Sequence, residues 1–263
     1  MKSVIKSLIA GAVIAAIGVI ILIAGLSVNG WKFENIKYTM QTFTAENENT
    51  ALDIRLNTGS LRTEFYDGDR IVIEYPTAKR FETLVAEDEG KITFHGLHRS
   101  DWHIVNLGIN NVPETVIKLP QNVLLDVSVL LDGGKVYLAG EGRFGNLKIS
   151  MDAGVFQTEN LVCETLICEL DAGTVKIGSA ECKTLKCELD AGIVKIDKLN
   201  CPSSVFDLDA GIVEAGFTGA QEEYTVYAEL HAGSCNLTNQ SGTTDKTIDV
   251  RLDAGTVKCK FGV

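Results

Sequence analysis

Most of the second half of the chain alternates apolar and polar residues over short segments that flank a recurring phrase. The phrase Leu-Asp-Ala-Gly stands at 170–173, 189–192, 208–211 and 252–255, with near-copies at 131–134, 151–154 and 230–233. In each copy, apolar residues lie three and five positions before the glycine, and mostly two and four positions after it. A period of two predicts a β-strand on each side of the phrase, with one buried face.

The phrase itself predicts a bend between two strands. Glycine adopts a left-handed backbone without the penalty of a Cβ atom, so we expect the last residue of each copy to form the turn. We expect the aspartate to point outward, where its carboxylate accepts backbone N–H bonds of the turn, and the alanine to point inward. The structural turn residues predicted in this way are Asp171, Gly173, Asp190, Gly192, Asp209, Gly211, Asp253 and Gly255.

The glycines that close the phrase are separated by 20, 19, 19, 19, 22 and 22 residues. A fixed period near twenty is typical of stacked repeats, in which no single repeat buries its own apolar face. Glycine at this interval and the many β-branched residues argue against helices. The sequence therefore predicts an all-β fold: a single-chain parallel β-solenoid, or β-helix, with rungs of about 19–22 residues over 51–263, regular over 123–263.

An almost wholly apolar run at 8–28 is long enough to cross a bilayer as a helix. The alternative is a cleavable signal peptide, which normally has a shorter apolar region and a small-residue cleavage site. We predict one N-terminal transmembrane α-helix at 8–28, with a cytoplasmic N-terminus at 1–7 before it and a polar tether at 29–50 after it. The helix would hold the protein in the lipid bilayer of the cell membrane as a single-pass chain.

The lysines that flank the apolar run bear on its orientation. Lys2 and Lys6 favour a cytoplasmic N-terminus and therefore an extracytoplasmic C-terminal domain. Lys32 and Lys37, on the far side of the run, oppose this orientation. The prediction is nevertheless an extracytoplasmic solenoid.

Four small residues of the apolar run, Gly11, Ala15, Gly18 and Gly25, follow helical spacing along one face. Small residues let transmembrane helices approach closely, so this face is a candidate surface for membrane-helix packing and self-association. The alternative is an ordinary lipid-facing helix that contains small residues.

The outward aspartates form a predicted column, one per rung. If the rungs stack at about 4.8 Å, neighbouring carboxylates repel each other by roughly 1 kcal/mol in water. Backbone N–H bonds in each turn would offset this repulsion and make the column a structural device. The alternative is a row of carboxylates that shares Ca²⁺ or another divalent cation, with the candidate ligands Asp152, Asp171, Asp190 and Asp209. No other cofactor is predicted.

The seven cysteines partly follow the repeat. Cys163, Cys182 and Cys201 are spaced by 19 residues, and so are Cys168 and Cys187. We interpret these residues as buried thiols that act as small hydrophobic side chains. The alternative is a disulfide between adjacent rungs, because the rung spacing lies inside the Cα range of such bonds. Free thiols favour a reducing compartment, which is the main argument for a cytoplasmic solenoid.

A second group of metal-ligand residues lies outside the repeats. His95, His98 and His103 cluster with Asp101 and Trp102 in an irregular stretch, and a His-x-x-His pair is able to hold a metal ion. A polar loop with three histidines more often binds nothing, which is the interpretation we adopt.

The formal net charge is −11, which excludes an electrostatic footprint for nucleic acid. The sequence contains no nucleophile elbow, phosphate loop or His-Glu-x-x-His motif, so we predict that the protein is not an enzyme. A solenoid enzyme that acts on polysaccharides is the remote alternative.

The final repeat ends close to the C-terminus, with eight residues after Gly255. We therefore expect the last strand to form an open edge that is blunted by Lys258 and Lys260 or that docks a partner strand or a second solenoid.

Two stretches carry a family resemblance: VIKLPQNVLLDVSVLLDGGKVYL at 116–138 and LDIRLNTGSLRTEF at 52–65. Together with the glycine-punctuated strands that follow, they resemble the bacterial "putative adhesin" proteins of domain of unknown function 4097. The resemblance covers roughly residues 50–263. It implies a β-solenoid, often behind an N-terminal membrane anchor, and supplies no functional residues.

These observations predict a membrane-anchored extracytoplasmic β-solenoid that serves as a cell-envelope binding, adhesin-like or scaffolding module. Its partners would be a protein or an envelope polymer. One alternative is an envelope sensing or regulatory module that acts through a membrane partner. Another is a cytoplasmic, membrane-tethered scaffold that polymerises through open solenoid ends.

Overall fold

The computed structural model describes residues 37–79, 81–98, 112–121, 123–139 and 143–263. The predicted transmembrane helix, the residues before it and most of the tether lie outside the described residues, as does the packing face at Gly11, Ala15, Gly18 and Gly25. No helix within the described ranges is long and apolar enough to span a membrane.

The described chain consists of twenty β-strands and one short 3₁₀ helix, η1 (Gln221–Glu223). The strands are β1 (Thr39–Thr44), β2 (Ala51–Leu56), β3 (Ser60–Tyr66), β4 (Val72–Thr77), β5 (Glu82–Asp88), β6 (Lys91–His98), β7 (Thr115–Pro120), β8 (Leu125–Leu131), β9 (Lys135–Leu138), β10 (Arg143–Met151), β11 (Val155–Leu170), β12 (Thr174–Glu181), β13 (Thr184–Leu189), β14 (Ile193–Asn200), β15 (Ser203–Leu208), β16 (Ile212–Phe217), β17 (Tyr224–Leu230), β18 (Ser234–Cys235), β19 (Lys246–Leu252) and β20 (Thr256–Phe261).

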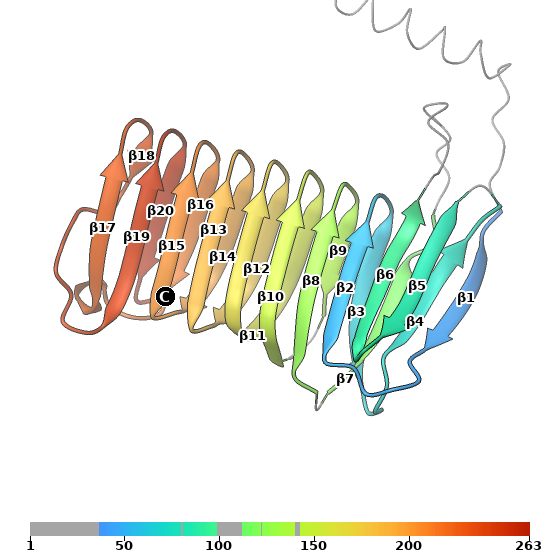
Figure 1. Ribbon diagram of the computed structural model, residues 1–263. Helices are drawn as coiled ribbons and strands as arrows, with labels where there is room; N and C mark the ends of the chain where they lie inside the picture. The colour runs from blue at the N-terminus through green and yellow to red at the C-terminus, as the bar shows by residue number, and fades with distance from the viewer. Residues whose placement is uncertain (1–36, 80, 99–111, 122, 140–142) are drawn as a thin grey trace, which may run out of the picture. The chain divides into compact units, whose positions relative to one another are not determined.

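The strands form two hydrogen-bonded ladders that face each other across one core (Figure 1). Strands that run into the Leu-Asp-Ala-Gly turn form the entry ladder, in the order β5-β6-β2-β8-β10-β11-β13-β15-β19-β17. Strands that leave the turn form the exit ladder, in the order β1-β4-β7-β3-β9-β11-β12-β14-β16-β20-β18. The sixteen-residue strand β11 bends and belongs to both ladders. The predicted all-β solenoid with parallel rungs is confirmed for the described residues.

Identical registers on successive rungs stack like residues into apolar columns. The repeat places each inward side chain directly above its counterpart, because parallel partners differ by one whole rung. Two such columns, each at most 2% exposed, are Leu170, Leu189, Leu208 and Leu252 in the entry ladder and Val175, Val194, Val213 and Val257 in the exit ladder. Full burial of each side chain stabilises the fold by about 1.5–3 kcal/mol, so the columns hold the two ladders together.

The order of rungs in space differs from the order in sequence at both ends. The rung formed by β2 and β3 lies between the rung of β6 and β7 and the rung of β8 and β9. The rung of β19 and β20 likewise lies between β15/β16 and β17/β18. The prediction that the last strand forms an open edge is therefore wrong. Lys258 lies within the row, where its Nζ is 3.4 Å from Oε1 of Glu214 on the neighbouring strand β16.

The C-terminal end of the solenoid is covered by the segment 236–245, which follows β18. Val226 of the outermost strand β17 exchanges two backbone hydrogen bonds with Gln240, at 2.9 and 3.2 Å. The Asn236 side chain continues the pairing of β18: its Oδ1 accepts from the Cys259 N–H at 2.8 Å, and its Nδ2 donates to the Cys259 carbonyl at 2.7 Å. These contacts satisfy backbone groups that an open end would expose.

The N-terminal end is covered by three antiparallel strands, β1, β4 and β5. Glu87 of β5 fixes the turn between β1 and β2, because its carboxylate accepts the backbone N–H groups of Glu46 at 2.7 Å and Asn47 at 2.9 Å. The Asn49 side chain donates a further bond to Glu87 at 3.0 Å. The hydrogen bonds from Glu46 and Asn49 lower the pKa of Glu87 to about 2, although burial opposes the shift.

The turns require glycine for two independent reasons. Gly192 has a φ of +105°, and a Cβ added to it would lie 2.8 Å from the carbonyl oxygen of Gly173 on the neighbouring rung. That same oxygen accepts the N–H of Ile193 at 3.0 Å, so the close approach is part of the ladder. The expectation that the alanine of the phrase points inward is wrong, because Ala191 is exposed and Ala172 is half-exposed.

Replacing a turn glycine separates these two reasons. Gly90, in the β5–β6 turn, also has a positive φ of +79°, but no atom lies within 4 Å of an added Cβ. We expect Gly90→Ala to lower the free energy of unfolding by about 1–2 kcal/mol through backbone strain. Gly192→Ala should lose about 1–3 kcal/mol more through the clash. Urea denaturation measures both values, and equal losses would show that the close approach does not matter.

The low pKa of Glu87 predicts an acid-sensitive contribution to stability. Its pKa lies below the ordinary value of 4.5, so its contribution is fully present above about pH 4.5 and is lost as the pH falls towards 2. We expect Glu87→Gln to lower Tm at neutral pH and to reduce the fall in Tm across that window. Glu82→Gln, on the exposed side of the same strand, is the control. Parallel Tm curves for the native chain and Glu87→Gln would contradict the assignment.

Candidate functional site

The turns place one acidic side chain per rung along a single edge of the solenoid. The registers of the entry ladder align the leucine or methionine before each aspartate, so the aspartates themselves follow one another in space. We call this row the acidic edge; its members are Asp132, Asp152, Asp171, Asp190, Asp209 and Asp253. His231 occupies the equivalent position on the last rung, next to Asp253.

The two ends of the acidic edge are paired, but its middle is not. Asp132 accepts a hydrogen bond from the Asn57 side chain and lies 3.6 Å from the guanidinium of Arg55. Asp253 Oδ1 lies 3.0 Å from Nδ1 of His231. In the described part of the chain, the four carboxylates between them have no hydrogen-bond or ion-pair partner; they belong to Asp152, Asp171, Asp190 and Asp209.

The turn backbone does not neutralise these four carboxylates, contrary to the expectation from the sequence. The turn N–H groups instead bond to carbonyl groups of the neighbouring rung, as when Asp190 N–H donates to Leu170 O at 3.0 Å. Neighbouring carboxylates stand one rung apart, at about 4.8 Å, and repel each other by roughly 1 kcal/mol in water. Their exposure to solvent keeps this repulsion small, and the edge remains attractive to cations.

A shallow depression of about 340 Å³ lies beside the middle of the acidic edge. Three further carboxylates line it, but each has a basic partner: Glu169 pairs with Lys148 at 2.8 Å, Glu188 with Lys186 at 2.5 Å and Asp207 with Arg251 at 3.9 Å. The pairing and a Ser150 hydrogen bond lower the pKa of Glu169, although burial opposes them. Charge compensation therefore stops at the strands and leaves the turn carboxylates uncompensated.

No group of three or more metal-ligating side chains is assembled to hold an ion within the described ranges. The candidate Ca²⁺ ligands Asp152, Asp171, Asp190 and Asp209 form a line one rung apart, whereas Ca²⁺ takes six to eight oxygen atoms around one centre. Of the histidine cluster, His95 Nε2 lies 2.8 Å from Asn57 Oδ1. The side chains of His98 and His103 lie outside those described.

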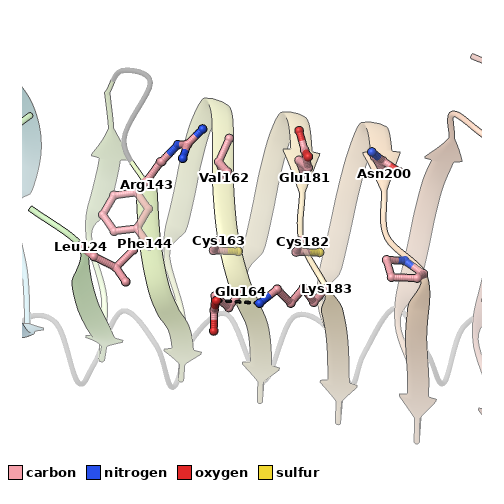
Figure 2. Close-up of a pocket in the computed structure, with 11 residues that line it drawn as sticks. Leu124, Arg143, Phe144, Val162, Cys163, Glu164, Glu181, Cys182, Lys183 and Asn200 are labelled. Carbon is pink, nitrogen blue, oxygen red and sulfur yellow. Dashed lines mark hydrogen bonds and ion pairs between the residues drawn. The ribbon is translucent and has the colours of Figure 1, made fainter. Parts of the chain in front are cut away.

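A second feature, which the sequence did not predict, is a groove of about 470 Å³ at the corner where the exit strands bend into the next entry strands. Figure 2 shows Arg143, Val162, Glu181 and Asn200 along one side of this corner groove. The ion pair between Glu164 and Lys183, at 2.7 Å, lies along the other side. The remaining lining residues are Leu124, Phe144, Cys163, Cys182 and Pro202.

The corner groove lies over a row of stacked thiols. Cys163, Cys182 and Cys201 occupy equivalent positions on three successive rungs, as the registers on either side of them require, and we call this row the thiol ladder. Cys163 and Cys182 line the groove and are 7% and 5% exposed, whereas Cys201 is fully buried. A second in-register pair, Cys168 and Cys187, is fully buried. All seven cysteines are free thiols, so stacking does not lead to disulfides here.

The thiols of the ladder share protons. The pKa of Cys182 is raised by its hydrogen bonds with Cys163 and Cys201 and by burial. The pKa of Cys201 is lowered to about 7, chiefly by the thiol of Cys182 and also by the neighbouring hydroxyl of Ser204, with burial opposing. Loss of one proton from the row is therefore favoured at the Cys201 end, while a second loss is resisted.

Similarity to known proteins extends over most of the chain. The family model described as Toastrack DUF4097 matches residues 49–260. No curated protein matches the chain.

Solved structures with a similar arrangement share little sequence. A "putative cell adhesion protein" from Clostridium sporogenes is 15% identical, with a TM-score of 0.43, over 86% of this chain and 100% of that one. A "putative adhesin" from Parabacteroides distasonis is 11% identical, with a TM-score of 0.43, over 86% and 98% of the two chains. A "putative lipid binding protein" from the same species is 11% identical, with a TM-score of 0.41, over 88% and 97%.

Proposed function

The chain belongs to the Toastrack DUF4097 family, whose model spans residues 49–260, and from this premise we propose that it is a non-catalytic binding module of the cell envelope. The module is anchored in the membrane by the apolar run at 8–28 and carries its solenoid outside the cytoplasm. The acidic edge is its binding surface.

The observation that carries this proposal is the row of four unpartnered carboxylates on a rigid frame. Each carboxylate sits on a turn whose backbone is bonded to the turn before it, for example through Asp209 N–H to Leu189 O at 2.9 Å. A surface that is ordered before binding loses little conformational entropy when a partner docks. The regular spacing of about 4.8 Å also suits a partner with a repeated cationic group.

The charge of the protein defines the chemical class of the partner. With a net charge of −11, the chain is repelled by anionic polymers and lipid surfaces unless cations bridge them. The partner is therefore a protein or an envelope polymer that presents basic groups. Asp171, Asp190 and Asp209 form the centre of the surface, because the depression beside them adds the field of partly neutralised Glu169, Glu188 and Asp207.

Neutralising the centre of the acidic edge tests the binding surface. The variant Asp171→Asn/Asp190→Asn/Asp209→Asn removes three exposed charges that have no partner. We expect its association with isolated bacterial cell envelopes to weaken by about ten-fold in co-sedimentation at low salt, since exposed charge pairs each contribute about 0.2–1 kcal/mol. Added salt should weaken the native chain towards the same level.

The matched control removes the same charge elsewhere. Glu159, Glu181 and Glu222 are exposed and lie off the acidic edge. The variant Glu159→Gln/Glu181→Gln/Glu222→Gln should sediment with envelopes like the native chain. Equal weakening by both triple variants would reduce the effect to net charge, and no weakening by the aspartate variant would remove the acidic edge from the proposal.

The location of the solenoid is tested separately, by protease treatment of intact protoplasts that carry the full chain with a C-terminal epitope tag. We expect the tag to be lost while a cytoplasmic control protein survives, because Lys2 and Lys6 favour a cytoplasmic N-terminus. A tag that survives until the membrane is lysed would place the solenoid in the cytoplasm and refute the extracytoplasmic assignment.

A further inference from the structure

The thiol ladder is chemically distinct from the acidic edge and has no part in the function proposed above. The Leu-Asp-Ala-Gly turns and the corner groove have no lining residue in common. Sulfur atoms stacked one per rung in an apolar core need no exposure to act as small hydrophobic groups, as Cys168 and Cys187 show. Cys163 and Cys182 differ from that pair because they reach the floor of the corner groove.

We infer that the thiol ladder is a binding site for a soft monovalent cation of the cuprous or silver type, held in linear two-coordinate fashion between the sulfur atoms of Cys163 and Cys182. Ions of this kind prefer thiolate ligands. The third sulfur, that of Cys201, lies directly behind Cys182 and stays within hydrogen-bonding reach of it.

The spacing of the rungs matches the span of two opposed metal–sulfur bonds. Parallel strands place equivalent residues about 4.8 Å apart, and in-register side chains extend in the same direction. A zinc–thiolate bond measures about 2.3 Å, and bonds to small soft cations are of similar length, so two of them in line span about 4.6 Å. Little movement of the strands is needed to place an ion between Cys163 and Cys182.

The ladder also selects against the common divalent ions. Zinc in structural sites requires four ligands in a tetrahedron, whereas a straight row offers only two sulfur atoms to any one ion. The absence of a three-ligand cluster in the ranges that the structure describes agrees with this restriction. Calcium and magnesium require oxygen atoms, which the thiol ladder does not provide.

The corner groove supplies a route for the ion and for the protons that it displaces. Binding converts two thiols and one cation into a bis-thiolate complex of net charge −1 and releases two protons to solvent. Arg143 and Lys183 line the same groove and place positive charge near the new anion. Cys168 and Cys187 have the same register but no such opening, so they form an internal comparison.

The test uses the full-length reduced chain under nitrogen, with silver(I) as the probe and an excess of a competing monothiol to prevent binding to single cysteines. We expect one silver ion to bind per chain, with thiolate-to-metal absorption in the ultraviolet and release of about two protons. Alkylation followed by mass spectrometry should show Cys163 and Cys182 protected by the ion. The half-buried Cys235 should remain reactive.

Two variants assign the site. Cys182→Ala should lower silver affinity roughly 100-fold or more by removing one of the two ligands, whereas Cys187→Ala, at the equivalent depth in the closed pair, should bind like the native chain. Circular dichroism melting controls for folding, and Cys163→Ser offers a second lesion at the groove if Cys182→Ala unfolds. No binding by the native chain, protection confined to Cys235, or equal losses in the Cys182 and Cys187 variants would each overturn the inference.

Discussion

The close approach of one glycine to the carbonyl oxygen of the glycine on the neighbouring rung is the contact on which the rest of the solenoid depends. A Cβ atom at any of the seven repeated turn glycines from 134 to 255 would lie 2.4–2.8 Å from that oxygen. The same oxygen accepts the N–H of the residue that follows the next glycine, at 2.9–3.0 Å along the whole row. This contact sets the distance between rungs and keeps the registers of both ladders identical. The apolar columns, the acidic edge and the thiol ladder all follow from that constancy.

The repeat in the sequence predicted the parts of the fold that depend on position within a rung. The alternation around each glycine is sufficient to place Leu189 inside and Asp190 outside, because the side chains of a strand alternate between its two faces. It does not specify which rung lies beside which. Only the longer spacings before Gly233 and Gly255, 22 residues instead of 19, hinted that the last two rungs are unlike the others. Their exchange depends on the covering segment 236–245, whose polar sequence has no period.

The candidate surfaces were predicted to the same extent. The rows of aspartates and cysteines are visible in the spacing of 19 residues, so the sequence identified which residues stack. It did not predict that the aspartates lack backbone partners, because that depends on how the turn N–H groups are used by the neighbouring rung. The corner groove was also missed, since it is built from three bends that are far apart in sequence. The ion pair of Glu164 with Lys183, also 19 residues apart, was the one available signal for it.

The exchanged order of the last rungs has a consequence for synthesis of the protein. During translation, residues 224–235 leave the ribosome before residues 246–261, yet in the finished molecule they have no neighbour except those later residues. The solenoid therefore cannot be completed by adding rungs in the order in which they are made. Its growing end is left at β15 and β16 until the final strand has emerged. Closure of the body is thereby tied to completion of the chain, and an interrupted product retains an exposed strand edge that quality-control proteases and chaperones can recognise.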